Sequence, residues 1–268
     1  MVRPRARRLG VAVTGEIGAA YSASAAAWAA GPALIYGRLA EALVARSPVA
    51  LTDRLALDVG AGTGAATRAL RARGARVVAL DAAVGMIASG PAAGVVGDAR
   101  LLPFRDRCFG VSAASFCLNH IDPPADGMRE MGRVTEPGGV VLVSSYGIDP
   151  EHPVKPAVEA SLASAGHVLP DWYEAIQSGP AAELRTEEGM TRVGHDAGLD
   201  PEVTEIDIAF PDLGVTDLVA WRMGMAHNAP FVATLTAAER DAVVGRALDA
   251  LRDAPTLLRR IVVLTAVV

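Results

Sequence analysis

The sequence predicts a doubly wound α/β fold, in which helices cover both faces of a parallel sheet. Four apolar runs of strand length support this prediction, at residues 55–57, 77–80, 109–116 and 140–146. Helix-forming stretches at 65–70 and 126–134 alternate with these runs, which is typical of parallel strands joined by helical crossovers.

The first two runs end in residues that indicate a nucleotide site. Residues 55–57 lead through Asp58 into glycines at positions 60, 62 and 64. Glycines at the point where a buried strand turns into a helix let the backbone approach a ligand at the carboxyl edge of the sheet. The second run ends in Asp81, whose carboxylate can accept hydrogen bonds from a ribose diol. An adenosine-containing ligand is therefore expected at this edge.

Two ligand classes fit the glycine turn. The spacing Gly60-x-Gly62-x-x-Ala65 is compatible with a dinucleotide, whose pyrophosphate would lie at the helix N-terminus. Asp58 favours the alternative, because a carboxylate repels a pyrophosphate and attracts a ligand that carries an ammonium and a sulfonium. S-adenosylmethionine is such a ligand. Asp98, at a further strand end, would then accept from the adenine amino group.

These segments resemble the class I S-adenosylmethionine-dependent methyltransferases, of the small-molecule kind related to ubiquinone and menaquinone C-methyltransferases. The motifs that carry the resemblance are Leu57-Asp58-x-Gly60-x-Gly62-x-Gly64, Asp81 with Met86, Gly97-Asp98-Ala99 to Leu102-Pro103-Phe104, and Glu130-Met131-x-Arg133-Val134 to Pro137-Gly138-Gly139. The resemblance implies a Rossmann-like, seven-stranded sheet whose last strand, 260–268, pairs antiparallel at the sheet edge. The expected cofactor-binding residues are Trp28, Asp58, Gly60, Ala61, Gly62, Gly64, Asp81, Ala82, Met86, Asp98, Ala99 and Ser115.

Composition restricts the partners. The 268 residues carry a net charge of −5 without a basic face, so we expect a small-molecule partner and no nucleic acid. No uncharged apolar stretch reaches the roughly 20 residues that span a bilayer, so we expect no membrane partner. Cys108 and Cys117 stand at opposite ends of one expected strand, too far apart to pair, which is consistent with the cytoplasm.

The chain is interpreted as one elaborated domain. Its expected segments are a basic, disordered tail (1–16), an N-terminal helical lid (17–50), a cofactor-binding core (51–147), an insertion (148–185) and the end of the sheet (186–268), with a helical insertion on the substrate side at about 214–254. The detour at 214–254 costs ordering entropy and suggests a use. The alternative is that it forms a homodimer contact or extra packing.

Two segments supply candidate substrate-binding residues. The helical pattern of 17–46, with a break at Gly31-Pro32, places Tyr21, Trp28 and Tyr36 on a lid, because an N-terminal helix closes over the cofactor in the resembling family. Simple core packing is the alternative for these aromatic side chains. The expected pocket walls also include Asn119, Trp221, Arg222, Met225 and Phe231.

Candidate bases follow from the chemistry of the donor. Methyl transfer from a sulfonium is an in-line displacement that needs little acid–base help when the nucleophile is already an anion. For a phenol, an alcohol or an enolisable carbon, a neutral histidine could take the proton. His120, just past the fourth expected strand, is the first candidate and His227 the second; a structural role is the alternative for His120. We expect no metal, because Asp122 and Asp126 are typical helix-start acids.

The expected function is transfer of a methyl group from S-adenosylmethionine to oxygen, carbon or nitrogen of a small, rather apolar metabolite, in specialised metabolism. Two alternatives keep the same cofactor site. One is an enzyme that catalyses a cyclisation or rearrangement on this fold, and the other is a cofactor-binding module without turnover.

Overall fold

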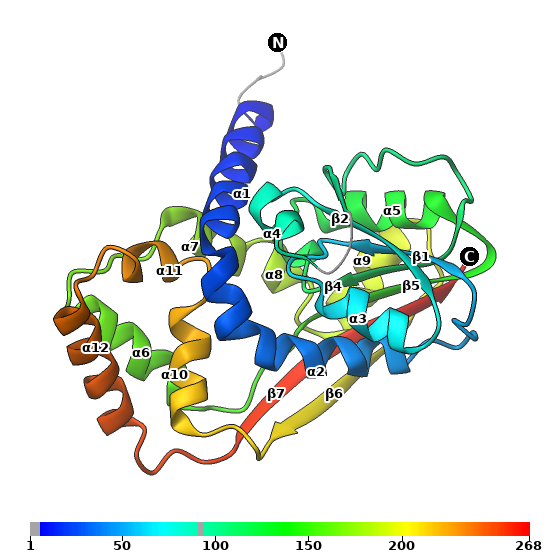
Figure 1. The fold of residues 1–268 in the computed structure, drawn as a ribbon. Helices are drawn as coiled ribbons and strands as arrows, with labels where there is room; N and C mark the ends of the chain where they lie inside the picture. Colours follow the sequence, from blue (N-terminus) through cyan, green and yellow to red (C-terminus); the bar gives the residue numbers. More distant parts are fainter. Residues whose placement is uncertain (1–5, 91–93) are drawn as a thin grey trace.

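A computed structural model describes residues 6–90 and 94–268 and shows one mixed sheet with helices on both faces (Figure 1). Within these residues the strands are β1 (Leu55–Val59), β2 (Arg76–Asp81), β3 (Gly94–Val96), β4 (Phe109–Ser115), β5 (Thr135–Tyr146), β6 (Glu202–Phe210) and β7 (Leu257–Val267). The sheet has seven strands in the order β3-β2-β1-β4-β5-β7-β6. Strands β1 to β5 run parallel, and β7 is antiparallel to both of its neighbours.

The topology confirms the predicted doubly wound fold. From β1 the chain adds β2 and β3 on one side, and it then returns to pair β4 with the other side of β1. In sheets of this kind, ligands bind outside the carboxyl ends of the strands, where the winding direction reverses. The glycines that follow β1 lie at this reversal.

The last strand is antiparallel as predicted, but its expected place at the sheet edge was wrong. β7 lies between β5 and β6, where Leu264 pairs with Val143 on one side and Val203 on the other. Residues 261–264 are buried on both faces, as is usual for an internal strand. β6 alternates with exposed acids such as Glu205, which suits an edge because charge discourages pairing with other chains.

Helices cover the sheet on both faces. The described helices are α1 (Ala6–Ala30), α2 (Pro32–Ala45), α3 (Ala65–Ala72), α4 (Val84–Ala88), α5 (Pro124–Val134), α6 (Val154–Ala163), α7 (Asp171–Ser178), α8 (Pro180–Glu183), α9 (Glu187–Asp196), α10 (Val215–Met223), α11 (Ala229–Val232) and α12 (Ala237–Ala250), with a short 3-10 turn, η1 (Leu118–His120). Side chains alternate along a strand. Leu142 of β5 therefore shares a core with Leu39 of α2, and Val143 shares the opposite core with Met131 of α5.

The N-terminal helix begins earlier than expected. α1 starts at Ala6, so residues 6–16 are helical where the sequence suggested a tail; residues 1–5 of that tail lie outside the described residues. The predicted break is present, because α1 ends at Ala30 and Pro32 opens α2. Figure 1 shows α1 projecting from the body at its N-terminal end. In the part of the chain that is described, no helix is long and apolar enough to cross a membrane.

The two insertions lie together. Residues 148–185 form α6, α7 and α8, and the connection between β6 and β7 forms α10, α11 and α12. Figure 1 shows α6, α7, α10, α11 and α12 gathered at one end of the sheet, next to α1, whereas α8 lies nearer the sheet beside η1. α10 packs on α2, α6 and α12. Their position beside α1 brings the insertions to the same end as the lid.

α1 is seated on α4 through a glycine. The backbone N–H of Gly85 donates to Ser22 Oγ at 3.3 Å. A Cβ atom at position 85 would lie 2.5 Å from the carbonyl oxygen of Ser22 and 2.8 Å from its Cα atom. Only glycine permits this approach of the two backbones.

We predict opposite effects for two glycine-to-alanine changes. Gly85→Ala should lower the free energy of unfolding by about 1–3 kcal/mol, because the new methyl group forces α1 away from α4. Gly37→Ala, within α2, meets no atom within 4 Å and should raise it by roughly 0.5–1 kcal/mol. Denaturant unfolding measures both values, and equal effects of the two changes would contradict this packing.

Candidate functional site

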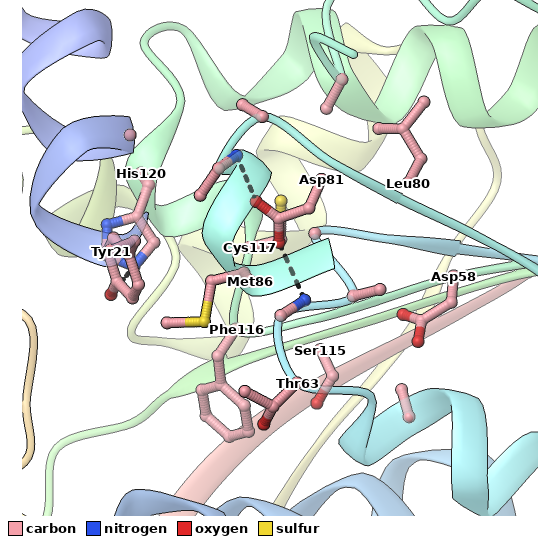
Figure 2. A pocket seen from close by; sticks show the side chains of 18 of the residues that line it. Tyr21, Asp58, Thr63, Leu80, Asp81, Met86, Ser115, Phe116, Cys117 and His120 are labelled. Atoms are coloured by element: carbon pink, nitrogen blue, oxygen red, sulfur yellow. Dashed lines mark hydrogen bonds between the residues drawn. The ribbon is translucent and has the colours of Figure 1, made fainter. Parts of the chain in front are cut away.

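A cavity lies at the carboxyl ends of β1, β2 and β4, beneath α1 (Figure 2). Every predicted cofactor-binding residue except Gly64 lines it, and so do the predicted lid residues Tyr21 and Tyr36 and the candidate base His120. Gly64 instead precedes α3, with φ at 90°. The sequence motifs and the N-terminal helix therefore meet in one cavity.

The turn after β1 depends on glycine. Gly60 and Gly62 have φ of 69° and 55°, in the left-handed region that side chains rarely adopt. A Cβ atom at Gly60 would also overlap the side chain of Cys117, which follows β4. At Gly62 a Cβ atom would meet nothing within 4 Å, so the backbone here faces open space in the cavity.

Asp81 is held by two backbone donors. Its Oδ2 accepts from the N–H of Gly62 at 2.8 Å, and its Oδ1 accepts from the N–H of Ala83 at 2.7 Å, as Figure 2 shows. Burial raises the pKa of Asp81, and these backbone hydrogen bonds counteract the increase. An ionised carboxylate has about four acceptor positions, so two remain for the hydroxyls of a ribose.

Asp58 is fully buried below the turn. Its Oδ2 accepts from Thr67 Oγ1 at 2.6 Å, while Oδ1 is buried without a hydrogen-bond partner among the described residues. Burial raises the pKa of Asp58 to about 6. A buried acceptor at the cavity wall fits a ligand with an ammonium group, as the sequence suggested. Thr67 was missed, although its place on the helix after the turn was a usable signal.

Asp98 has a partner that the sequence analysis did not anticipate. Arg100 donates to it through the side chain, with Nη2 to Oδ2 at 2.7 Å, and through the backbone N–H at 2.8 Å. Both residues line the cavity. The expected bond from Asp98 to adenine stays a prediction, with part of the carboxylate already engaged by Arg100.

Aromatic side chains enclose the other end of the cavity. Ring centroids are 5.4 Å apart for Tyr21 and Trp28, 4.8 Å for Trp28 and Tyr36, and 5.2 Å for Tyr36 and Phe116. In a chain with only 4% aromatic residues, four of them gather here. Phe116 was not predicted as a site residue; its φ of 57° is unusual for a bulky residue and marks the turn after β4.

His120 is held at this aromatic end by the lid. The hydroxyl of Tyr21 lies 3.1 Å from His120 Nε2, and Figure 2 shows the two side chains facing each other. His120 Nδ1 is buried without a partner in the described part of the chain. Burial lowers the pKa of His120 to about 4, so the ring is neutral at pH 7. Nε2 is thus the ring nitrogen that contacts the N-terminal helix, and Nδ1 is the one without a partner among the described residues.

The predicted residues of the second insertion lie outside the lining of this cavity, and their role in substrate binding stays a prediction. They are Trp221, Arg222, Met225, His227 and Phe231, which pack against neighbouring helices and strands. His227 stacks on Tyr173, for example, and Phe231 stacks on His167. Asn119 also lies outside the lining, with Nδ2 3.4 Å from His120 Nε2. These contacts join distant segments, so local sequence patterns could not indicate them.

Two further features of the chain concern metal binding and the cysteine thiols. Among the described residues, no three side chains of His, Cys, Asp or Glu come together in a way that could hold a metal ion. Cys108 and Cys117 are both free thiols, and burial raises the pKa of Cys117.

We expect the buried carboxylate of Asp58 to lower stability at neutral pH and to strengthen binding of S-adenosylmethionine. The folded-state pKa of Asp58, about 6, lies above its ordinary 3.8, so its contribution to stability is fully present below pH 3.8 and is lost as the pH rises through 6. As the pH rises from 3.8 to 7.5, the free energy of unfolding of the Asp58→Asn variant should therefore increase by about 2–3 kcal/mol relative to that of the wild type. The same change should weaken binding of S-adenosylmethionine about tenfold or more, through loss of the charge-assisted contact.

Urea unfolding over this pH range and calorimetry at pH 7.5 measure the two effects. An unchanged pH dependence of stability in the variant would show that Asp58 is ionised in the folded protein at low pH, contrary to its burial.

Residues 57–143 match the family described as "Methyltransferase domain". A demethylmenaquinone methyltransferase of Mycobacterium sp. (strain KMS) is 35% identical over 150 residues, which are 55% of this chain and 64% of that protein. The chain thus spans less than two thirds of the length of this curated relative.

Two solved structures share the fold. Phosphoethanolamine N-methyltransferase 2 of Haemonchus contortus, in complex with phosphomonomethylethanolamine and S-adenosylhomocysteine, has a TM-score of 0.52 and 19% identity over 84% of this chain and 51% of that one. The cyclase SpnF has a TM-score of 0.50 and 21% identity over 86% of this chain and 80% of that one. At such identities the likeness concerns the fold alone. The shared fold agrees with the methyltransferase domain that is matched at residues 57–143, the segment that contains β1, β2 and β4 of the cavity.

Proposed function

We propose that this protein transfers the methyl group of S-adenosylmethionine to a small, largely apolar acceptor with a planar ring. One observation carries the proposal: a single cavity contains both the Asp58 and Asp81 carboxylates and, at its other end, the aromatic side chains with His120. The carboxylate end suits an adenosine and an ammonium, and the aromatic end suits a flat apolar molecule. Transfer of a group between two bound molecules requires that the molecules lie next to each other, and the two ends of this cavity are adjacent.

The cofactor residues fit the donor. Asp81 would hold the ribose hydroxyls, and the free Oδ1 of Asp58 would face the ammonium group. Met86 and Ala99 add apolar walls for the adenine. S-adenosylmethionine, when bound, supplies an electrophilic methyl group on sulfur.

His120 is the proposed base. A lone pair of the acceptor forms the new bond to the methyl carbon, the electrons of the broken carbon–sulfur bond stay on sulfur, and the proton of the acceptor passes to a ring nitrogen of His120. In the tautomer that carries its hydrogen on Nε2, this hydrogen points to the Tyr21 hydroxyl, 3.1 Å away. The unpartnered Nδ1 is then the nitrogen that accepts the proton of the acceptor. The aromatic side chains that line this end of the cavity would limit the access of water, which favours transfer over side reactions.

Formation of S-adenosylhomocysteine tests the reaction class. Purified protein, S-adenosylmethionine and a panel of phenols, naphthols and quinols should yield S-adenosylhomocysteine in amounts equal to the methylated product, measured by chromatography and mass spectrometry. Conversion of an acceptor with no S-adenosylhomocysteine would instead identify a cyclisation or rearrangement. Binding of the cofactor without any turnover across the panel would favour a non-catalytic module.

We predict distinct kinetic effects for the histidine and its partner. His120→Asn should lower kcat by roughly 10²–10⁴ for an acceptor that must lose a proton, without weakening binding of S-adenosylmethionine. Tyr21→Phe should lower kcat about 5- to 30-fold, the value of one hydrogen bond that orients the ring. Because the pKa of His120 is about 4, the wild-type rate should fall only as the pH drops towards 4.

His195→Asn provides a matched control, since His195 is exposed at the end of α9. This variant should retain wild-type kinetics. If His120→Asn also retained them with a phenolic acceptor, the proposed base would be excluded.

A further inference from the structure

A group of hydrogen-bond donors lies buried beyond the aromatic wall of the cavity. It consists of Tyr146 at the end of β5, Trp221 and Arg222 on α10, and Arg259 on β7, and we call it the donor cluster. In three of these residues one donor atom is buried without a partner within the described chain, namely Trp221 Nε1 and the Nε atoms of both arginines. The hydroxyl of Tyr146 interacts with that of Tyr36. Buried donors are normally satisfied, so three neighbours without partners call for an explanation.

The four side chains pack against one another. The guanidinium carbon of Arg259 lies 4.1 Å from the ring centroid of Tyr146 and 5.1 Å from that of Trp221. The guanidinium carbon of Arg222 lies 5.4 Å from the same Trp221 ring. Trp221 and Arg222 are only 1% and 5% exposed, so the cluster is interior rather than a surface patch.

The acids around the donor cluster engage only the outer nitrogens of the arginines. Arg259 Nη2 lies 2.8 Å from Asp149 Oδ2, and Arg222 Nη2 lies 3.2 Å from Glu159 Oε1. Burial raises the pKa of Asp149 above its ordinary value, although the positive charges of Arg259 and Arg185 partly offset this increase. Each arginine of the cluster thus has one carboxylate beside its outer nitrogens, and the inner Nε donors remain unpaired.

One layer of side chains separates the donor cluster from the cavity. The ring of Tyr146 lies 4.5 Å from that of Phe116 and 6.0 Å from that of Tyr36, measured between centroids. Both Phe116 and Tyr36 line the cavity. A substituent on a ring bound among the aromatic side chains would reach the cluster by passing these two residues.

We infer that the acceptor carries a carboxylate and that the donor cluster is the site that recognises it. This inference rests on the proposed function, because it concerns the acceptor end of the same cavity. A carboxylate offers about four acceptor positions, and its hydrogen bonds to arginine and tyrosine are charge-assisted. A neutral carbonyl offers only two positions, and its hydrogen bonds to arginine lack the contribution of a negative charge. Tyr146 and Arg259 would thereby determine which ring compounds the enzyme accepts.

Two simple probes test the charge requirement. Benzoate and benzamide have the same shape and differ in charge, and calorimetry at pH 7.5 measures their affinity for the protein saturated with S-adenosylhomocysteine. We expect benzoate to bind at least tenfold more tightly than benzamide. Equal affinity of the two probes, or no binding of either, overturns the inference.

A single hydroxyl provides the sharper test. Tyr146→Phe should weaken benzoate about tenfold and leave benzamide unchanged. Its melting temperature without ligand, measured beside that of the wild type, separates a loss of stability through the Tyr36 contact from a loss of benzoate binding. Tyr173→Phe is the matched control, since Tyr173 lies outside both the cavity lining and the cluster, and it should change neither probe.

A crystal structure with benzoate decides where the carboxylate lies. Carboxylate oxygens within hydrogen-bond distance of Tyr146 Oη and Arg259 Nε support the inference, and ordered water alone at these atoms overturns it. Binding of benzoate through Tyr146 in a protein that never forms S-adenosylhomocysteine would contradict the methyltransferase proposal while leaving the carboxylate site in place.

Discussion

The close contact between Gly60 and Cys117 determines where the rest of the site can lie. The turn after β1 and the turn after β4 approach so closely that no Cβ atom fits at Gly60. This contact brings the segment that ends at His120 beside the segment that holds Asp81. Both turns require uncommon backbone angles, with positive φ at Gly60 and at Phe116. A doubly wound sheet places these strand ends side by side. The contact between Gly60 and Cys117 then holds the two turns around one cavity.

Burial acts in opposite directions on the two titratable groups of the cavity. It raises the pKa of Asp58 to about 6 and lowers that of His120 to about 4. At pH 7 an ionised Asp58 is therefore costly in the empty site, and an ammonium group would offset that cost. His120 is neutral at the same pH, so its stabilising effect on the fold is present above its ordinary pKa of 6.5 and is lost as the pH falls towards 4. The same desolvation thus favours a cation beside one group and keeps the other unprotonated.

The cofactor end could be predicted from the sequence, whereas most of the acceptor end could not. Asp58, the glycines and Asp81 follow strands whose apolar patterns are local, so their place at one sheet edge follows from the topology alone. Trp221 and Phe231 were expected at the cavity, but their positions depend on how α10 and α11 pack against segments far away in the chain. The place of β7 inside the sheet likewise depends on pairing across more than forty residues.

The N-terminal helix couples the two ends of the cavity through consecutive residues. Tyr21 reaches His120 at the acceptor end, and Ser22 receives the backbone of Gly85 beside the cofactor end. One rigid helix therefore touches both ligand sites within a single turn. Displacement of α1 would break both contacts together, so neither site can be covered by the helix while the other is left open. The Tyr21 hydroxyl, which contacts His120, is thus carried by the same helical turn that packs on α4. We therefore expect the packing of Gly85 against Ser22 to affect the position of His120, the proposed base.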